Sequence, residues 1–291
     1  MMLARRSAVT SVQRSLRRRA MTQPPSRAFH LSSAAGKPAG NSRVASAASF
    51  FLDAKAACKS KRCALGKDHS GIGANPAACG EDSFFLTPDV VGVADGVGGW
   101  NENGVDPGKI SRSLMRNAAV FVRQQTANNE SATTQQVLAH GYNQALLDDE
   151  VEAGSTTACI VRLKQSPEGK PVLEYSNLGD SGFVVIRNGE IIFRSKFQVR
   201  GKTLYSFGEC GLADGCGCCG STTDVRLSGM HDAGNAGTLL LWNPLASFVD
   251  VIAENPDKAA ENIVLASLRH NLKPDDITVV VAKVVVMAAK L

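Results

Sequence analysis

The chain has 291 residues, 44% of them hydrophobic, enough for one large domain or two small ones with a buried core. The net charge of +5 comes from residues 1–48, which carry eight Arg, one Lys and no acid; removing those nine positive charges leaves −4 for residues 49–291. An acidic body argues against nucleic acid as the main partner, and since no run of 18 apolar residues occurs, no integral membrane span is predicted.

The first 48 residues are rich in Arg, Ser and Ala, and the first acid of the chain is Asp53. This composition is typical of an organelle transit peptide and lacks the apolar centre of a secretory signal. The segment from Arg27 to Ser33 resembles a two-step mitochondrial cleavage pattern. We therefore expect residues 1–48 to be a mitochondrial transit peptide or a disordered tail, and the protein to reside in the mitochondrion, in the matrix.

Acidic residues stand at the ends of two predicted strands in the body of the chain. Residues 49–80 contain three Cys and no clear period, and then Glu81 and Asp82 open a short apolar strand that Pro88 ends. A second apolar strand, beginning at Val90, stops at Asp95. Neighbouring strands joined by a short turn favour an antiparallel pair, which would set the two acids beside Asp95.

Asp95 is followed by glycine in the sequence VVGVADGVGGW. An Asp at the end of a buried strand is costly unless a cation or several donors compensate it, and the carbonyl of Gly96 offers a second hard oxygen beside it. Hard oxygens suit Mg²⁺ or Mn²⁺. The alternative from these residues alone is an ordinary Asp-Gly turn after a strand.

The remaining elements alternate in pairs. Helical spacing predicts helices from Asp106, as N-cap, through Val122 and over about 133–152. Three strands are expected at 154–161, 172–176 and 183–186, and Asn188-Gly189 predicts a hairpin into residues 191–193. Paired helices and hairpins indicate an α+β fold with antiparallel sheets.

The chain closes with a helix over about 256–270 and an apolar strand preceded by Asp275 and Asp276. Carboxylates thus stand at the end of two strands that are far apart in the sequence. If those strands meet in the fold, Asp95 and Asp275 or Asp276 would come together.

The motifs GEDSFF, VGVADGVGGW, GSTTACIV, NLGDSGFVVIRNGE and KPDDITVVVAKV resemble, in order and spacing, the metal-dependent Ser/Thr protein phosphatases of the protein phosphatase 2C family, in its mitochondrial T-cell-activation-type branch. The resemblance covers about Gly80–Arg194 and Pro256–Ala282. It implies a four-layer αββα sandwich, in which two antiparallel sheets are flanked by helix pairs, as a single domain over residues 49–291.

The resemblance also implies roles for the acids. Asp95 would bridge two Mn²⁺ or Mg²⁺ ions, Glu81 and the Gly96 carbonyl would serve one of them and Asp275 the other, while Asp82 would orient metal-bound water. No covalent enzyme intermediate is needed. The expected reaction is hydrolysis of phosphoserine and phosphothreonine in protein substrates by a monomer. Relatives hold phosphate with an Arg upstream of the paired acids; no Arg lies between Cys63 and Glu81 here, so Lys67 is the candidate substitute.

Residues 197–250 depart from the family pattern. The family has another metal-binding Asp-Gly after a late strand, but the apolar segment ending at Trp242 is followed by Asn243-Pro244. We hypothesise an altered reading frame or splice across this stretch; an uninterrupted transcript encoding it, and the same segment in the purified protein, would refute that. If the sequence is literal, the chain is a weak enzyme or a pseudophosphatase that binds phosphoproteins.

Two other chemistries have local support. A Cys-rich stretch with a nearby histidine invites a zinc site, formed by Cys210, Cys216, Cys218, Cys219 and His231. Its spacing is not the usual paired one, and free thiols are the expectation for a matrix protein. The segment Gly179-Asp180-Ser181-Gly182 is similar to the nucleophile segment of chymotrypsin-like proteases, but a catalytic Ser needs an adjacent base and no His stands in a partner motif.

Overall fold

The computed structural model describes residues 49–62, 71–197, 199–200, 203–204, 223–226, 238–242, 258–270 and 275–287. Residue contacts divide the chain into Met1–Val44 and Ala45–Leu291, and every described residue belongs to the second unit. The predictions made for the basic N-terminal segment, Lys67, the proposed zinc ligands and Asn243-Pro244 therefore fall outside the described residues. No described helix combines the length and hydropathy needed to cross a lipid bilayer.

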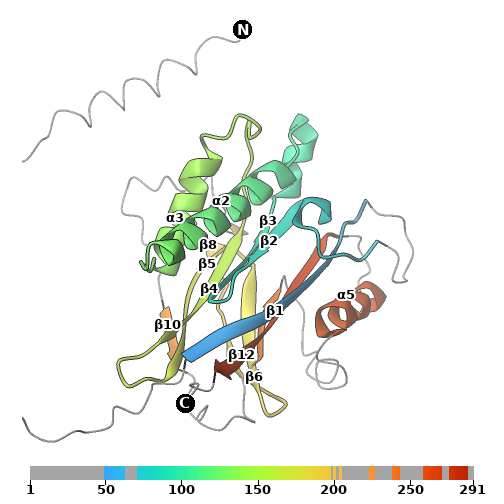
Figure 1. The fold of residues 1–291 in the computed structure, drawn as a ribbon. Coiled ribbons are helices and arrows are strands. Elements are labelled where there is room, and N and C mark those ends of the chain that lie inside the picture. Colours follow the sequence, from blue (N-terminus) through green and yellow to red (C-terminus); the bar gives the residue numbers. More distant parts are fainter. Residues whose placement is uncertain are drawn as a thin grey trace, which may run out of the picture. The chain divides into compact units, whose positions relative to one another are not determined.

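Two five-stranded antiparallel sheets form the centre of the unit (Figure 1). One has the order β1 (Ser49–Lys59), β12 (Ile277–Met287), β11 (Thr238–Trp242), β6 (Gly182–Arg187) and β7 (Glu190–Arg194). The other has the order β10 (Thr223–Arg226), β5 (Pro171–Leu178), β4 (Ala158–Gln165), β3 (Val90–Asp95) and β2 (Asp82–Leu86). A short pair, β8 (Val199–Arg200) and β9 (Thr203–Leu204), stands apart. The antiparallel α+β arrangement predicted from the sequence is thus confirmed.

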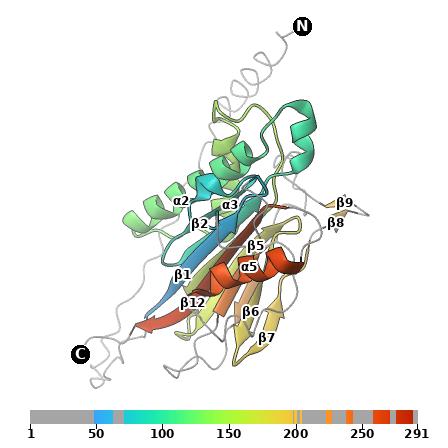
Figure 2. The same ribbon diagram turned by 90° about the vertical axis from the view of Figure 1, so that its right-hand side faces the viewer.

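The helices cover the outer faces of the sheets (Figures 1 and 2). Helices α2 (Gly108–Ala127) and α3 (Thr134–Ala145) pack on the sheet that contains β2 to β5, and α5 (Ala259–His270) packs on the sheet of β1 and β12. Three apolar clusters separate the layers, one between the sheets and one under each helical layer. A helix pair therefore flanks one sheet as expected, and α5 is the described helix on the other.

Local sequence signals account for the ends of several elements. Asp106, the expected N-cap, accepts a hydrogen bond from the backbone N–H of Gly108 at 3.0 Å, but it lies one residue before the observed N-cap, Pro107. Thr133 and Gln136 form a capping box at the start of α3, which ends well before the predicted residue 152. Asn188 and Gly189 have φ angles of 51° and 79°, as the predicted two-residue hairpin requires.

Residues 49–80, whose apolar residues show no clear period, contain β1, which pairs with β12 along its whole length. Asp, Ala and Lys, which make up most of residues 53–59, are weak strand formers, so the partner strand rather than local propensity makes this part of β1 extended. Cys58, near the end of β1, forms a disulfide with Cys79 at a Cα–Cα distance of 5.4 Å. The expectation of free thiols was wrong for this pair, while Cys159 is free and buried.

The 3₁₀ turns η1 (Pro76–Ala78) and η2 (Gly98–Asn103) flank the β2–β3 hairpin. The first precedes the paired acids in the chain, and the second directly follows Asp95-Gly96 and Val97. Both therefore lie at the ends of elements that carry the predicted site residues.

Candidate metal centre

The β2–β3 hairpin places the predicted acids at one end of its sheet. Its register sets Asp82 opposite Asp95, and the N–H of Gly96 donates to the carbonyl of Glu81 at 3.0 Å. The segment before β4 fixes the other side, because the Thr157 N–H and the Thr156 hydroxyl both donate to the Asp95 carbonyl at 2.9 Å. The predicted proximity of Glu81 and Asp82 to Asp95 is therefore observed.

The acids that precede β12 reach the same end from the other sheet. The carboxylate of Asp276 accepts one hydrogen bond from the Glu81 N–H at 2.9 Å and another from the Lys61 N–H at 2.7 Å. Gly80 permits this approach: its φ is +79°, and a Cβ there would lie 2.3 Å from an Asp276 oxygen. Asp276 is thus a buried structural acceptor, whereas the side chain of Asp275 is 66% exposed at the rim.

The crowding of carboxylates raises their pKa values. Burial raises the pKa of Asp95 to about 7; a hydrogen bond with Asp82 opposes the shift, and the charges of Asp180, Asp275 and Asp276 add to it. Burial first, and then the charge of Asp95, raise the pKa of Asp82 well above its usual value. Both Asp82 oxygens are buried and lack a hydrogen-bond partner of good geometry, although the Thr278 hydroxyl and Asp95 lie close enough to affect its pKa.

Among the described residues, Lys61 places its positive charge between these acids. The ammonium of Lys61 is 2.7 Å from a Glu81 carboxylate oxygen, 3.5 Å from Asp276 and 3.9 Å from Asp275. Burial alone would lower the pKa of Lys61, but the hydrogen bond with Glu81 and the charges of the three acids raise it above its usual value. Lys61 thus acts as the counter-charge of the cluster, a role that our sequence analysis missed because β1 was not recognised.

Other contacts orient Glu81. The side-chain amide of Asn101 in η2 donates to its second carboxylate oxygen at 2.7 Å, and the Ser111 hydroxyl donates to its carbonyl at 2.5 Å. Arg112 reaches from α2 to the carbonyl of Gly80 at 2.8 Å and to Asp106 at 2.7 Å. The indole N–H of Trp100 donates to the Ser155 hydroxyl at 2.9 Å. Apart from the VADGVGGW motif, no sequence signal marks these supporting residues.

Gly96 allows the turn that follows Asp95. A Cβ at this position would lie 2.3 Å from the Pro107 carbonyl oxygen and 2.9 Å from that of Glu81. Only glycine therefore fits at position 96, between β2 and the start of α2. Gly98 is tight as well, because a Cβ there would lie 2.9 Å from a Glu81 carboxylate oxygen. The glycines of the motif thus serve close packing around Glu81.

The acidic cluster offers oxygen donors to a divalent cation. Among the described residues, no three His, Cys, Asp or Glu side chains stand in a ready ligating group. The Asp82 carboxylate, buried without a well-placed hydrogen-bond partner, and the high pKa of Asp95 nevertheless mark an excess of negative charge that a cation relieves. Asp95 and Asp275, with the Gly96 carbonyl, supply the hard oxygens that Mg²⁺ or Mn²⁺ prefers, so the donor set fits such an ion.

The serine of the protease-like segment lies in a different environment. Ser181 is buried, and its hydroxyl shares a hydrogen bond of 2.5 Å with the Thr157 hydroxyl. His140, in α3, stacks on Phe121 with the ring centroids 4.1 Å apart. Ser181 therefore belongs to the packing behind Asp95, and this geometry does not favour the protease alternative.

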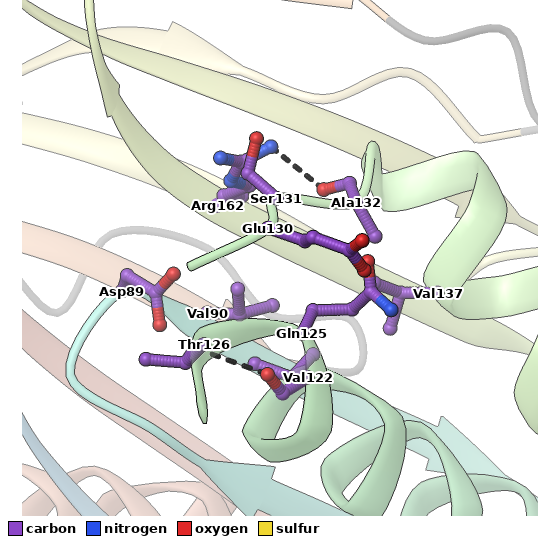
Figure 3. A pocket seen from close by; sticks show the side chains of 10 residues that line it. All are labelled: Asp89, Val90, Val122, Gln125, Thr126, Glu130, Ser131, Ala132, Val137 and Arg162. Atoms are coloured by element: carbon purple, nitrogen blue, oxygen red, sulfur yellow. Dashed lines mark hydrogen bonds between the residues drawn. The ribbon is translucent and has the colours of Figure 1, made fainter. Parts of the chain in front are cut away.

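A small hollow lies at the opposite end of β3, beside Val90 (Figure 3). Asp89, Glu130 and Arg162 are among its lining residues, and the Arg162 guanidinium donates to the Ala132 carbonyl at 2.6 Å. Its volume of about 10 Å³ holds no more than one water molecule. The acidic end of the hairpin is therefore the better candidate for chemistry on a substrate.

Comparisons with known proteins show similarity to protein phosphatases. No family model matches the chain. Curated relatives include protein phosphatase PTC7 homolog fig of Drosophila pseudoobscura pseudoobscura, 44% identical over 42% of this chain and 36% of its own length. The PTC7 homolog of Homo sapiens is 39% identical over 47% of this chain and 45% of its own length. The chain thus spans less than half the length of these relatives.

Two solved structures share the fold. The photosystem II phosphatase PBCP matches 80% of this chain and 98% of its own with a TM-score of 0.58 at 23% identity. The catalytic domain of the serine/threonine phosphatase PstP, in complex with two manganese ions, matches 81% of this chain and 100% of its own with a TM-score of 0.53 at 18% identity. The chain therefore has the fold of these two phosphatases and is similar in sequence to PTC7 protein phosphatases over part of its length.

Proposed function

We propose that the chain is a metal-dependent phosphatase that hydrolyses phosphoserine and phosphothreonine in protein substrates. The convergence of Glu81, Asp82 and Asp95 with Asp275 from the other sheet carries the proposal. Divalent cations held by Asp95, Glu81, Asp275 and the Gly96 carbonyl would acidify a water molecule and offset charge on the phosphoryl oxygens. Mn²⁺ or Mg²⁺ suits these ligands, and relatives support the choice, since PstP was crystallised with two manganese ions.

The chain's own residues have distinct tasks in this proposal. Asp82, buried without a well-placed hydrogen-bond partner, would accept a proton or a hydrogen bond from the attacking water. Asn101 and Lys61 hold the Glu81 carboxylate in place. The ammonium of Lys61 stands at the acidic rim, where it can also contact a phosphoryl oxygen, so Lys61 joins Lys67 as a candidate for the phosphate contact.

The test is hydrolysis of p-nitrophenyl phosphate and of a phosphothreonine peptide by the purified chain with Mn²⁺, with Mg²⁺ and with EDTA. We expect activity that needs the metal and is lost in Asp95→Ala. The same assay separates the protease alternative, which predicts inhibition by a fluorophosphonate and indifference to EDTA.

A second candidate function is binding of phosphoproteins without turnover. Strand β11 ends at Trp242, which pairs with Val279 near the start of β12, so it ends on the acidic side of the sheet. The next residue in the sequence is Asn243, where the family pattern has an acid. Phosphopeptide binding without hydrolysis, together with hydrolysis gained in Asn243→Asp, would favour this candidate.

We also propose mitochondrial import directed by residues 1–48, from their basic, acid-free composition. A fluorescent protein fused after residue 48 should accumulate in mitochondria. The same fusion with the Arg residues of the segment changed to Gln should not. Retention of both fusions outside mitochondria would contradict the proposal.

A further inference from the structure

A groove of about 560 Å³ lies beside the β2–β3 hairpin. One wall is the segment Ala74–Ala77, which includes part of η1; the floor is Ser83–Leu86 of β2, and the other wall is α2. This volume falls in the range of ligand sites rather than of packing defects. None of the groove's lining residues belongs to the proposed metal centre, although Arg112 in its wall contacts the carbonyl of Gly80.

The groove follows the edge of a sheet. Among the described strands, β2 is the last of its sheet and pairs with β3 alone. Side chains of consecutive strand residues point to opposite faces, so a hollow over one face would be lined by every second residue. Here four consecutive residues, Ser83 to Leu86, line the groove, which means that it runs along the strand edge. Such an edge can accept an extended peptide as an additional strand.

The helix wall carries positive charge and an exposed apolar side chain. Arg112, Arg116, Val120 and Arg123 lie at helical spacing on one face of α2, and all four line the groove. Val120 is 41% exposed, and the Arg116 side chain is 56% exposed. The lining residues include three Arg and no acid. This charge contrasts with the net acidic body of the chain.

The arginines are not equally available. The Arg112 guanidinium donates hydrogen bonds to the Gly80 carbonyl and to the Asp106 carboxylate. One guanidinium nitrogen of Arg116 donates to the Asp148 carboxylate. Within the described residues, Arg123 forms no ion pair. Arg116 retains further N–H donors, so Arg116 and Arg123 are the groups that can bind a carboxylate from a partner.

The dimensions suit an extended segment. From Arg112 to Arg123 the helix rises about 16 Å, and about five residues of an extended peptide cover the same length. Apolar side chains of such a peptide would meet the partly exposed Leu86 of β2 and the exposed Val120 of α2, while its acidic side chains would face Arg116 and Arg123.

We propose that this groove binds an extended segment of a partner protein in which acidic residues alternate with apolar ones. The peptide adds to the β2 edge and pairs its carboxylates with Arg116 and Arg123. If the chain is the phosphatase proposed above, the groove holds substrates by a segment separate from the phosphorylated residue; this use rests on the proposed function, while the binding itself does not.

Binding is tested on the full chain in EDTA, with a fluorescein-labelled unphosphorylated peptide that alternates Glu with Leu or Val. We expect saturable binding that weakens at least about tenfold in Arg116→Glu/Arg123→Glu and less in Arg123→Gln. Arg194→Glu, an exposed arginine on β7, is the matched control and should bind as the unaltered chain does. Thermal melts of all variants show that folding is retained.

Three results would overturn the proposal: no saturable binding, equal loss in Arg194→Glu, or equal affinity for a peptide with Lys in place of Glu. A kinetic arm separates this failure from failure of the proposed function. In Arg116→Glu/Arg123→Glu, the KM for a phosphopeptide carrying the acidic and apolar tract should rise, whereas kcat and the KM for p-nitrophenyl phosphate should stay unchanged. Binding without any turnover would refute the phosphatase proposal but not the groove.

Discussion

The two ends of the β2–β3 hairpin differ in how well their buried polar groups are hydrogen-bonded. At the turn, the Thr87 N–H donates to the Val90 carbonyl at 2.8 Å and the Thr87 hydroxyl accepts from the Val90 N–H at 2.9 Å. The backbone carbonyl of Asp89 accepts from the Leu163 N–H at 2.7 Å. At the other end, the Asp82 carboxylate is buried without a well-placed partner, opposite Asp95.

This difference separates stability from function within one hairpin. A buried polar group that is fully hydrogen-bonded costs little, whereas crowded carboxylates weaken the fold unless a cation is present. The turn therefore has the pattern expected of a structural element. At the acidic end, repulsion between the carboxylates destabilises the fold, and a bound cation would offset that repulsion.

The largest expected effect is on the rate of hydrolysis, when one Asp at each end of the hairpin is changed to Asn. Asp95→Asn should lower metal-dependent hydrolysis of p-nitrophenyl phosphate by about 100-fold or more, because the carboxylate proposed to hold the metal would lose its charge. The matched change at the turn, Asp89→Asn, keeps an oxygen acceptor for Thr87 and should leave the rate within about twofold.

Thermal melts in EDTA sharpen the same comparison. Asp95→Asn should raise the melting temperature, since it removes a carboxylate whose pKa is raised to about 7. A lower melting temperature for this variant would contradict the account of the acidic end as an electrostatic penalty.

The next largest expected effect is the loss of stability when a glycine of the motif is changed to alanine. Gly96→Ala should destabilise the fold by about 3 kcal/mol or more, because its Cβ would meet the Pro107 and Glu81 carbonyls. Gly99→Ala, two residues after Val97, has open space at the Cβ position and should change stability by no more than about 0.5 kcal/mol. Urea denaturation measures both, and equal midpoints would show that the turn tolerates the extra carbon.

The pH dependence of stability follows from the raised pKa values. Below about pH 4, Asp95 is protonated in both the folded and the unfolded chain. As the pH rises towards 7, the unfolded chain loses this proton while the folded one keeps it, so metal-free stability should fall by up to about 1.4 kcal/mol per pH unit. Asp95→Asn should reduce this slope, and so should Asp82→Asn, because the pKa of Asp82 is raised as well. An unchanged slope would disprove the assignment.

The smallest effect belongs to the turn. Thr87→Val removes the hydroxyl that bonds Val90 and Asp89 and should cost about 1–2 kcal/mol of stability without altering hydrolysis. Thr87→Ser keeps the hydroxyl and serves as the control. Loss of activity in Thr87→Val at full stability would mean that the two ends are coupled.

The sequence alone predicted the α+β class, the hairpin from Asn188-Gly189 and the acids beside Asp95, because these features rest on turn chemistry and on the period of apolar residues. It missed β1, since the Asp, Ala and Lys residues of that segment are weak strand formers, and with β1 it missed the role of Lys61. It also named Asp275 without showing that its neighbour Asp276 holds the backbone of Glu81 and Lys61.

Local pattern therefore determined which residues end strands and which turns join them. Only the tertiary structure decided which strand ends meet, because the pairing of β1 with β12 and the packing of the two sheets join residues about 200 positions apart. The disulfide of Cys58 with Cys79, the position of Lys61 among three acids and the groove beside β2 all depend on those long-range contacts.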